Sequence, residues 1–480
     1  TIVVCFPFKG TAVVTETKAA LWTDGRYYLQ AESQLDSNWI LMKDGLPNTP
    51  TKEQWLIEVL PTGSKVGVDP WVITHGGWYK MLQELSAAGL SLVFTEKNLI
   101  DLVWEDHGRP DPPNEGLMVL DIAFTGKSWQ EKVREVRAAL AKKKADILVV
   151  TALDEIAWLL NLRGSDVVFN PVFFAYVMIK QDELLKSTPH YTDDSITQAN
   201  LSLGVLIRDA IALCEYFSWL EREVPKNHVT EISGAAKLEK LRRYPVKPFS
   251  EVFAFRPAEE TNRVITNQEL YLCDSGAQFK DGTTDVTRTW HFGSPTKWQR
   301  ECFTRVLKGH IALARAVFPN KTTGHRLDTL ARMALWDTGL DYLHGTGHGI
   351  GSFLNVHEGP QSISYRSREN EASLEAGMMV TDEPGYYEDG AFGIRIESVL
   401  LVKPIELENN FKNRGYLCFE PITLFPIQTK LLSPTMLTCE EIEWINCYHD
   451  LCAENVGAAL REQGRTSALN WLLKETAPLG

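Results

Sequence analysis

The chain has 480 residues and a formal net charge of -13, with 44% hydrophobic and 23% charged residues. A chain of this length exceeds one ordinary hydrophobic core, so two or three domains are expected. The acidic surplus argues against nucleic acid and anionic membranes as partners, because both attract basic surfaces.

The sequence predicts neither a membrane-spanning helix nor a signal peptide in the residues given. No window approaches the roughly 18 consecutive apolar residues of a membrane-spanning helix. Residues 1–15 lack a basic segment followed by a long apolar core, so they do not predict a signal peptide, and the chain is expected to begin inside a domain. The eight cysteines include no CxxC pair, which favours free thiols in the reducing cytoplasm.

Residues 1–116 predict an α/β domain that ends in a linker. Short apolar strands alternate with polar helical segments, the strands at 11–15, 18–23 and 90–95 and the helices at 51–60 and 77–88. Residues 22–27 read as a turn with Arg26 at its exit, where the simplest role for the arginine is a surface salt bridge. The proline, glycine and charge content of 105–116 marks the linker.

A second domain is predicted over residues 117–202. Ser128 and Glu131 form a capping-box pattern, so a helix is expected from there to Lys144. The apolar run 147–153 predicts a strand of the buried parallel type.

The third domain is predicted over residues 203–480. Two strands, 271–279 and 283–290, are expected to form a hairpin that brings Asp274 and Asp285 to the same end of a sheet. Helical periodicity and capping patterns predict helices at 205–224, 231–243, 296–318, 327–337 and 438–461.

Potential metal ligands follow one another in this third domain, each in a phrase rich in glycine and small polar residues: Asp274, Asp285, His348, Glu383 and Glu397. Four carboxylates and one imidazole form a hard, oxygen-rich set that suits Mn(II), Co(II) or Zn(II). Four carboxylates balance two divalent cations, and bridging oxygens can hold the pair around a shared water that becomes a hydroxide near neutral pH. The pattern therefore predicts a dinuclear hydrolase.

Each of these residues alone has a simpler explanation. Asp274 and Asp281 are common turn formers, Glu397 can be an exposed strand residue, and a lone histidine is more often a core or surface residue. The residues in series favour the metal site, as do the glycines around His344 and His348, which let the backbone approach a metal.

The phrases that carry these residues resemble those of the pita-bread metallopeptidases, which include methionine aminopeptidase, prolidase and aminopeptidase P. They are most similar to those of the large cytosolic Xaa-Pro aminopeptidases, and they read DSGAQF, DGTTDVTRT, HGTGHGIGSFLNVHEGP, DEPGYYEDG and GIRIE. The resemblance extends from WTDGRYYLQAE near the start to FEPITLFPIQTK and the helix beyond it.

The resemblance implies an α/β multidomain fold. A pita-bread catalytic domain would occupy residues 203–480, preceded by two creatinase-like α/β domains. The first of these, 1–116, would be truncated at its N-terminus, and the second, 117–202, would be shortened.

The resemblance also implies roles for the metal ligands. Asp274 would chelate one metal, Asp285 and Glu397 would bridge the pair, and His348 would bind one ion. Glu383 would be both a ligand and the general base that takes the proton from the bridging water.

Other matched residues would act on the substrate. Arg26, His344 and His348 would line the substrate site, where His344 would also orient its neighbours. His357 would donate to the substrate carbonyl or to the developing gem-diolate. Arg395 would orient the ligands or neutralise their charge, and its alternative is a cross-strand ion pair.

The sequence departs from the resembled family in two places. The middle domain of the large enzymes runs on much further, so an unpaired sheet edge or a disordered loop is expected after residue 180. The family also carries a glycine-rich segment with a pocket histidine before the phrase that begins at Pro257. This chain has no histidine between His228 and His291, so it lacks a group that hydrogen-bonds the substrate or intermediate.

The leading hypothesis is a cytoplasmic, manganese-dependent Xaa-Pro aminopeptidase with two Mn(II) ions, proline-containing peptide substrates and, by resemblance, a homodimeric assembly. A prolidase that acts on Xaa-Pro dipeptides is an alternative, because the ligands themselves do not distinguish these enzymes. A third hypothesis is a catalytically impaired, truncated homologue that acts only as a binding module.

Overall fold

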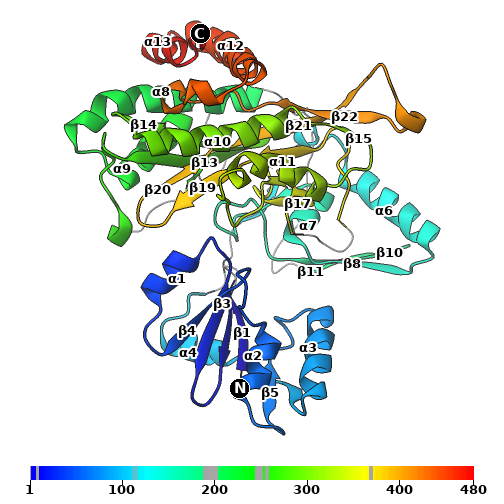
Figure 1. The fold of residues 1–480 in the computed structure, drawn as a ribbon. Helices are drawn as coiled ribbons and strands as arrows, with labels where there is room; N and C mark the ends of the chain where they lie inside the picture. The colour runs from blue at the N-terminus through cyan, green and yellow to red at the C-terminus, as the bar shows by residue number, and fades with distance from the viewer. Residues whose placement is uncertain are drawn as a thin grey trace. The chain divides into compact units, whose positions relative to one another are not determined.

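The computed structural model describes residues 2–6, 10–111, 113, 116–187, 204–243, 252–254, 259–366 and 371–480. The chain divides into two compact units, residues 1–112 and 113–480. Figure 1 shows the elements of both units.

The first unit is built on a six-stranded mixed sheet in the order β4-β3-β2-β1-β5-β6. Its strands are β1 Ile2–Phe6, β2 Gly10–Val14, β3 Ala19–Thr23, β4 Trp39–Lys43, β5 Lys65–Val68 and β6 Ser91–Phe94. Its helices are α1 Tyr28–Gln34, α2 Lys52–Val59, α3 His75–Ala87 and α4 Leu99–Asp106. The predicted α/β domain is confirmed, and its buried core includes Val13, Trp22, Trp55, Leu56 and Leu85.

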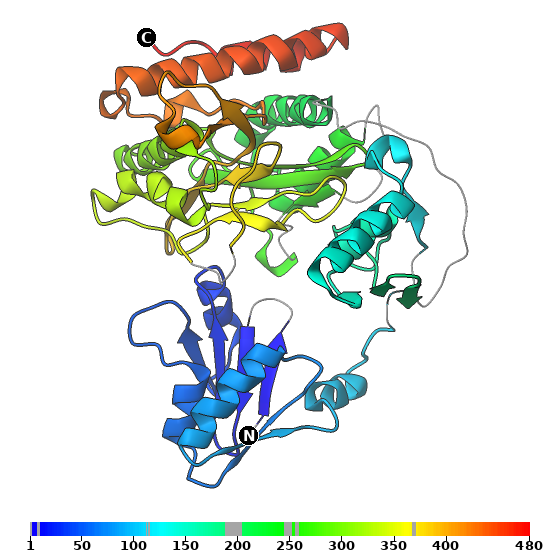
Figure 2. The same cartoon turned by 90° about the vertical axis from the view of Figure 1, so that its right-hand side faces the viewer.

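The second unit begins with a small α/β segment over residues 117–187, called here the middle segment. Its elements are β7 Met118–Val119, α5 Ile122–Thr125, α6 Trp129–Lys143, β8 Ile147–Val150, α7 Leu153–Leu160, β9 Leu162–Arg163, β10 Tyr176–Lys180 and β11 Leu184–Ser187. Ser128 and Glu131 form the predicted capping box, so α6 begins where the sequence indicated. Helix α6 packs against β10 of the three-stranded sheet β11-β10-β8 (Figure 2).

Strand β8 corrects one prediction. It pairs antiparallel with β10 rather than parallel, and its first three residues are exposed rather than buried. Within the described residues β8 has this single neighbour, so no second strand covers its outer edge. An apolar run is buried as a strand when neighbouring strands and covering layers surround it, and among the described residues β8 is the edge strand of its sheet.

The remainder of the second unit combines three sheets, in the orders β12-β13-β14, β15-β22-β21-β18-β16-β17 and β19-β20. The strands are β12 Val252–Ala254, β13 Leu270–Phe279, β14 Gly282–His291, β15 Val317–Pro319, β16 Gly347–Gly349, β17 Glu358–Ile363, β18 Met379–Asp382, β19 Gly385–Glu388, β20 Phe392–Arg395, β21 Ser398–Ile405 and β22 Tyr416–Pro421. The helices are α8 Gly204–Glu223, α9 Glu231–Arg242, α10 Lys297–Ala314, α11 His325–Trp336, α12 Cys439–Glu462 and α13 Thr466–Glu475. Single 3-10 turns lie at Val224–Lys226, Glu259–Thr261, Phe411–Asn413, Thr429–Leu431 and Pro434–Met436.

Helix α10 is shorter than predicted. It ends at Ala314 rather than at Phe318, because residues from Val317 onward pair with β22 as strand β15. The Phe318 ring lies 5.0 Å from that of Phe419, so tertiary packing overrides the local helical pattern. Helix α13 was not predicted.

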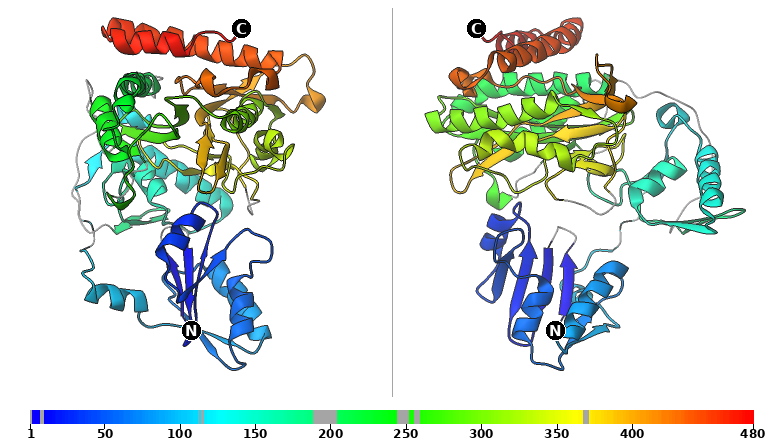
Figure 3. Two further views of the ribbon diagram at one scale, coloured as in Figure 1. Left: turned by 60° about the vertical axis from the view of Figure 1, so that its left-hand side comes forward. Right: turned by 45° about the vertical axis from the view of Figure 1, so that its right-hand side comes forward.

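An aromatic cluster supports the hairpin of β13 and β14 from behind. Phe217 of α8 lies 5.1 Å from Trp290 of β14, and Trp290 lies 5.5 Å from Trp471 of α13, measured between ring centroids. Helices α12 and α13 pack against α8, as the red and green helices in Figure 3 show. Truncating a buried aromatic side chain of this kind costs about 3–5 kcal/mol, so the hairpin rests on a rigid base.

Candidate metal centre

The hairpin of β13 and β14 carries two of the predicted ligands. The strands form the predicted hairpin: they join through Lys280 and Asp281, with Gly282 already in β14, and pair in antiparallel register. Asp274 lies opposite Thr287, and Asp285 lies opposite Gly276. Residues that lie opposite share a face of the sheet, as do residues two apart, so Asp274 and Asp285 project from the same face.

Glycines on either side of His348 let β16 approach its neighbouring strands. A Cβ added at Gly347 would lie 1.9 Å from the carbonyl oxygen of Thr381, and one at Gly349 would lie 2.1 Å from that of Glu358. These contacts are with β18 and β17, so strand packing alone requires both glycines. The Nδ1 atom of His348 lies 2.9 Å from the Gly349 carbonyl oxygen, which leaves Nε2 to face the acids.

Glu397, just before β21, is held by β14. Its backbone N–H donates to the Thr287 carbonyl at 3.0 Å, and the Thr287 hydroxyl donates to Glu397 Oε2 at 2.6 Å. The residue is 2% exposed. A threonine on β14 therefore fixes one oxygen of a buried carboxylate that arrives from another sheet.

Glu383 comes directly after β18 and also approaches His348. Its backbone N–H donates to the Thr346 carbonyl at 2.7 Å, and its Oε1 accepts from the Thr381 hydroxyl at 3.5 Å. The same Oε1 lies 3.6 Å from His348 Nε2, while Asp285 Oδ2 lies 3.5 Å from it. The Nε2 atom of the imidazole thus faces two carboxylates.

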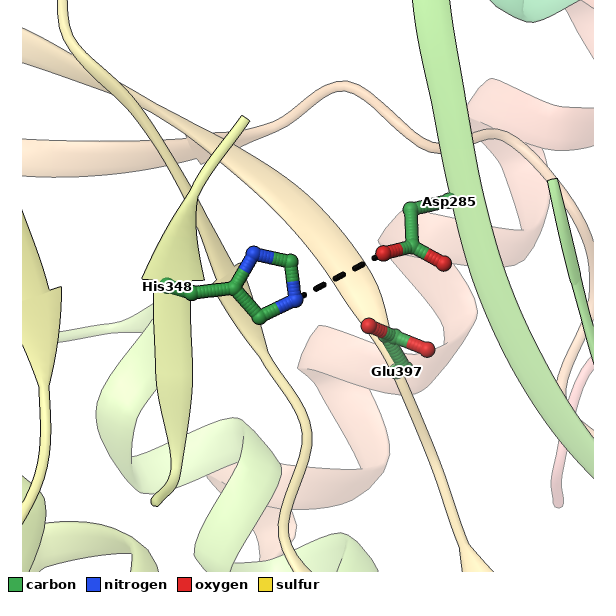
Figure 4. Close-up of side chains that lie close together, drawn as sticks. All are labelled: Asp285, His348 and Glu397. Carbon is green, nitrogen blue, oxygen red and sulfur yellow. Dashed lines mark ion pairs between the residues drawn. The ribbon is translucent and has the colours of Figure 1, made fainter. Parts of the chain in front are cut away.

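Among the described residues, ligand atoms of Asp285, His348 and Glu397 lie within 4.8 Å of one another, an arrangement that can hold a metal ion. Figure 4 shows the three side chains converging from different strands. This group of three does not include Asp274 or Glu383.

Burial and mutual repulsion set the protonation of these groups. Burial, together with the carboxylates of Glu397 and Asp274, raises the pKa of Asp285 well above its usual range. Burial, followed by the Asp274 carboxylate, raises the pKa of Glu397 to about 7, and burial with the Glu397 carboxylate raises that of Glu383. Crowded acids of this kind ionise readily when a divalent cation compensates their charge, so the donor set fits a metal.

His348 is in the neutral form that metal binding requires. Burial, and then the neighbouring His357, lowers the pKa of His348 to about 3. A neutral imidazole offers its Nε2 lone pair at physiological pH.

Asp274 is engaged by Arg395 of β20. The Arg395 Nη2 atom forms an ion pair with Asp274 Oδ2, its Nη1 donates to the Tyr387 hydroxyl at 2.8 Å, and its Nε donates to the Thr287 hydroxyl at 3.2 Å. Arg395 Nε also lies 3.9 Å from Glu383 Oε2. The predicted alternative for Arg395, a cross-strand ion pair, is therefore present, and it partly neutralises the acids.

Tyr387 is a site residue that the sequence analysis missed. Its hydroxyl lies 2.9 Å from His344 Nε2, so a chain of contacts runs from His344 through Tyr387 and Arg395 to Asp274. The repeated tyrosine of the GYYEDG phrase was the available signal, but nothing local distinguishes an inward from an outward tyrosine on a short strand.

His357 and Arg26 lie in different surroundings. The His357 ring is exposed and lies 4.3 Å from the His348 ring, so it borders the group of three. Arg26 belongs to the first unit, where its guanidinium pairs with Asp24 at 2.6 Å. The pair is a salt bridge, as the simplest interpretation of the sequence expects, but the Asp24 side chain is buried rather than at the surface.

A cavity of about 280 Å³ lies beside Asp274 and Arg395. Its remaining wall comes mainly from aromatic and aliphatic residues of α8, α9 and β13, among them Tyr216, Leu238, Tyr271 and Leu272, with Glu231 as a further acid. The shortened connection before Pro257, where the resembled family has its pocket histidine, falls largely outside the described residues.

Three segments of the chain match known families. Residues 108–243 match the creatinase/prolidase N-terminal domain, residues 206–404 match metallopeptidase family M24, and residues 415–479 match the C-terminal region of peptidase M24. Among the helices that the structure describes, none has the length and apolar character needed to cross a membrane.

The chain is also similar to individual proteins over nearly all of its length. It is 43% identical to Xaa-Pro aminopeptidase ApepP of Drosophila melanogaster and 41% identical to a protein of Coprinopsis cinerea named probable Xaa-Pro aminopeptidase P; each alignment covers 98% of this chain and 90% of the relative. The crystal structure of X-prolyl aminopeptidase from Caenorhabditis elegans, described as a cytosolic enzyme with a dinuclear active site, superposes with a TM-score of 0.91 at 35% identity, covering 98% of this chain and 90% of that one.

The alignment with the Drosophila protein spans 554 positions. Because this chain has only 480 residues, at least 74 of those positions have no residue here. These missing positions are internal to the aligned region, as the two shortenings expected from the sequence would be.

Proposed function

We propose that this chain, which belongs to metallopeptidase family M24, is a metalloaminopeptidase that releases the N-terminal residue from Xaa-Pro peptides. The observation that carries the proposal is the convergence of Asp285, His348 and Glu397 from separate strands. Full-length similarity to Xaa-Pro aminopeptidases supports the choice of reaction and of substrate.

The proposed cofactor is a pair of divalent cations, Mn(II) first and Co(II) or Zn(II) as alternatives, because the donors are mostly carboxylates. Asp274, Asp285, His348, Glu383 and Glu397 would hold the pair. When bound, two such cations supply Lewis acidity that polarises the amide carbonyl and activates water for attack.

The protein's own groups would then direct the proton transfers. Glu383, whose Oε1 lies 3.6 Å from His348 Nε2, would take the proton from the attacking water. His357, exposed next to His348, would donate to the carbonyl oxygen as negative charge develops on it. Arg395 would hold the Asp274 carboxylate in place through their ion pair.

Substrate recognition is proposed for the groups around this centre. His344 would fix the Tyr387 hydroxyl at the edge of the cavity, and Arg26 is proposed from family resemblance to reach toward the peptide. We also propose a homodimer in the cytoplasm; the cytosolic description of the Caenorhabditis enzyme supports that compartment.

An assay with two substrates tests the function. The purified chain loaded with Mn(II) should release arginine from the tripeptide Arg-Pro-Pro faster than from the dipeptide Arg-Pro, and Glu383→Gln should remove this activity while leaving the fold intact. Faster cleavage of the dipeptide would instead favour a prolidase.

Metal analysis separates an impaired enzyme from a non-enzyme. Up to two divalent ions per chain are expected by mass spectrometry after dialysis. A folded chain that binds no divalent ion would contradict the proposal. Bound metal without turnover would indicate that the shortened connection before Pro257 disables the site, and inserting the relative's longer segment there should then restore activity.

A further inference from the structure

The loop between β16 and β17, residues 350–357, carries His357 and is buried where it meets the middle segment. Phe353 is completely buried, and Leu354, which is 3% exposed, packs into a core whose other buried members lie between Val133 and Ile179. Phe353 has a backbone φ of +51°, a left-handed conformation that a bulky residue adopts only when its surroundings impose it.

Arg163 of β9 holds this loop from the middle segment. Its Nε donates to the Phe353 carbonyl at 2.5 Å, and its Nη2 donates to the Ser352 carbonyl at 3.4 Å. Its Nη1 donates to the carbonyls of Ala157 and Leu162 at 3.0 and 2.8 Å. One guanidinium thus ties two carbonyls of the loop to two carbonyls of the middle segment.

The charge of this guanidinium is maintained although the residue is 3% exposed. Burial lowers the pKa of Arg163 to about 10, and the Glu358 carboxylate opposes that change. The group therefore remains protonated at neutral pH, and backbone carbonyls take the place of water around it.

A second contact fixes the loop from the hairpin side. The Gln278 side chain of β13 donates to the Leu354 carbonyl at 2.6 Å and accepts from the Thr283 hydroxyl at 2.8 Å. The loop is therefore held between the strand that carries Asp274 and the arginine of the middle segment, and it leads directly into His357.

We propose that Arg163 is a positioning residue for the reaction: by fixing the carbonyls of Ser352 and Phe353 it sets the place of His357 beside His348. The proposal rests on the function proposed above. It gives the middle segment a part in catalysis, because the segment supplies the group that orders a catalytic loop.

Two substitutions at Arg163 test the proposal. Arg163→Lys keeps the charge but loses the planar fork that reaches several carbonyls, and Arg163→Met loses both. We expect Arg163→Lys to lower kcat by about 10- to 100-fold, the usual scale for groups that orient catalytic residues, with KM within about threefold. Arg137→Met is the matched control, because Arg137 donates to the Lys180 carbonyl within the same segment and does not touch the loop; its kcat should stay within about twofold.

A double substitution at Arg163 and His357 distinguishes a role of Arg163 in positioning His357 from a general role in stabilising the fold. In a His357→Ala background, Arg163→Lys should change kcat by less than about twofold, because the residue through which it acts is already lost. Independent, multiplying effects of the two substitutions would overturn the proposal.

Hydrogen exchange gives a readout that needs no activity. Amides of residues 350–357 should exchange at least about tenfold faster in Arg163→Lys than in the parent chain, and not in Arg137→Met. If the chain binds metal but cleaves no peptide, the proposed function fails. The exchange rates still show whether Arg163 holds the loop of residues 350–357 in place. Unchanged exchange in Arg163→Lys would overturn the inference itself.

Discussion

Strand β14 is polar in sequence and buried along its whole length, whereas β8 is apolar in sequence and exposed at three of its four residues. The polar strand can be buried because its side chains find partners: the Thr289 hydroxyl donates to the Arg395 carbonyl at 2.9 Å, and Arg288 Nη2 donates to the Phe425 carbonyl at 2.7 Å. The apolar strand is exposed because the described residues provide a neighbour on one side only. Neighbours, rather than composition, decide burial in both cases.

The largest expected difference between the two strands concerns activity. Asp285→Asn on β14 should lower kcat by about 10³-fold, the scale of an essential catalytic group, and should reduce the bound metal below that of the parent chain. Asp146→Asn, which alters an exposed acid just before β8, is the control and should leave kcat within about twofold. Steady-state assays with metal analysis check both. Full activity in Asp285→Asn would remove β14 from the site.

The next difference concerns stability. Arg288→Met on β14 should lower the free energy of unfolding by about 3 kcal/mol, because buried carbonyls such as that of Pro426 lose the donor that Arg288 supplies. Urea denaturation measures the change. Lys403→Met on β21 removes an ion pair with Glu420 in which both side chains are 49% exposed, so it should cost less than about 1 kcal/mol. Equal losses of unfolding free energy in the two variants would show that the buried contacts of Arg288 stabilise the fold no more than an exposed ion pair does.

The boundary between the catalytic loop and the middle segment should respond to pH. Burial, followed by the Asp154 carboxylate, raises the pKa of Glu358 to about 7 in the folded chain. An acid whose pKa is raised by folding contributes stability that is complete below about pH 4 and is lost as the pH rises through 7. The parent chain should therefore lose on the order of 2 kcal/mol relative to Glu358→Gln between pH 4.5 and 8. Parallel urea midpoints for the two proteins over that range would contradict the assignment.

The smallest expected effect is at the open strand. Val149→Lys on β8 should change the unfolding free energy by less than about 0.5 kcal/mol, because Val149 is 55% exposed. It should also reduce concentration-dependent association measured by light scattering, since a lysine on a strand edge disfavours pairing with another chain. Val286→Lys, at a valine of β14 that is 3% exposed, should instead prevent stable folding. A large loss of unfolding free energy in Val149→Lys would mean that the edge of β8 is covered.

Local patterns predicted the parts of the fold that are locally determined. The capping boxes at Ser128 and Thr438 and the hairpin of β13 and β14 each depend on residues close to one another in sequence, and each formed as expected. The pairing of β8, the end of α10 at Ala314 and the orientation of Tyr387 depend on distant neighbours instead. No local pattern contains that information.

The candidate site shows the same difference between features set by local sequence and features set by distant residues. The acids were recognisable because each stands in a distinctive phrase, but the side chains that hold them in place were not. Asp274 pairs with Arg395, and Thr287 holds Glu397, through contacts that span more than a hundred residues of sequence. The sequence could name these side chains but could not tell which oxygen each would offer.

The insertion of Leu354 into the middle segment also has a consequence for biogenesis. On the ribosome, residues 117–187 emerge long before residue 354, so the side chain that completes their core is missing until some 170 further residues have been synthesised. The middle segment should therefore remain a protease-sensitive nascent intermediate over that interval. A stalled chain released at residue 340 should be digested within this segment, and one released at residue 400 should be protected there.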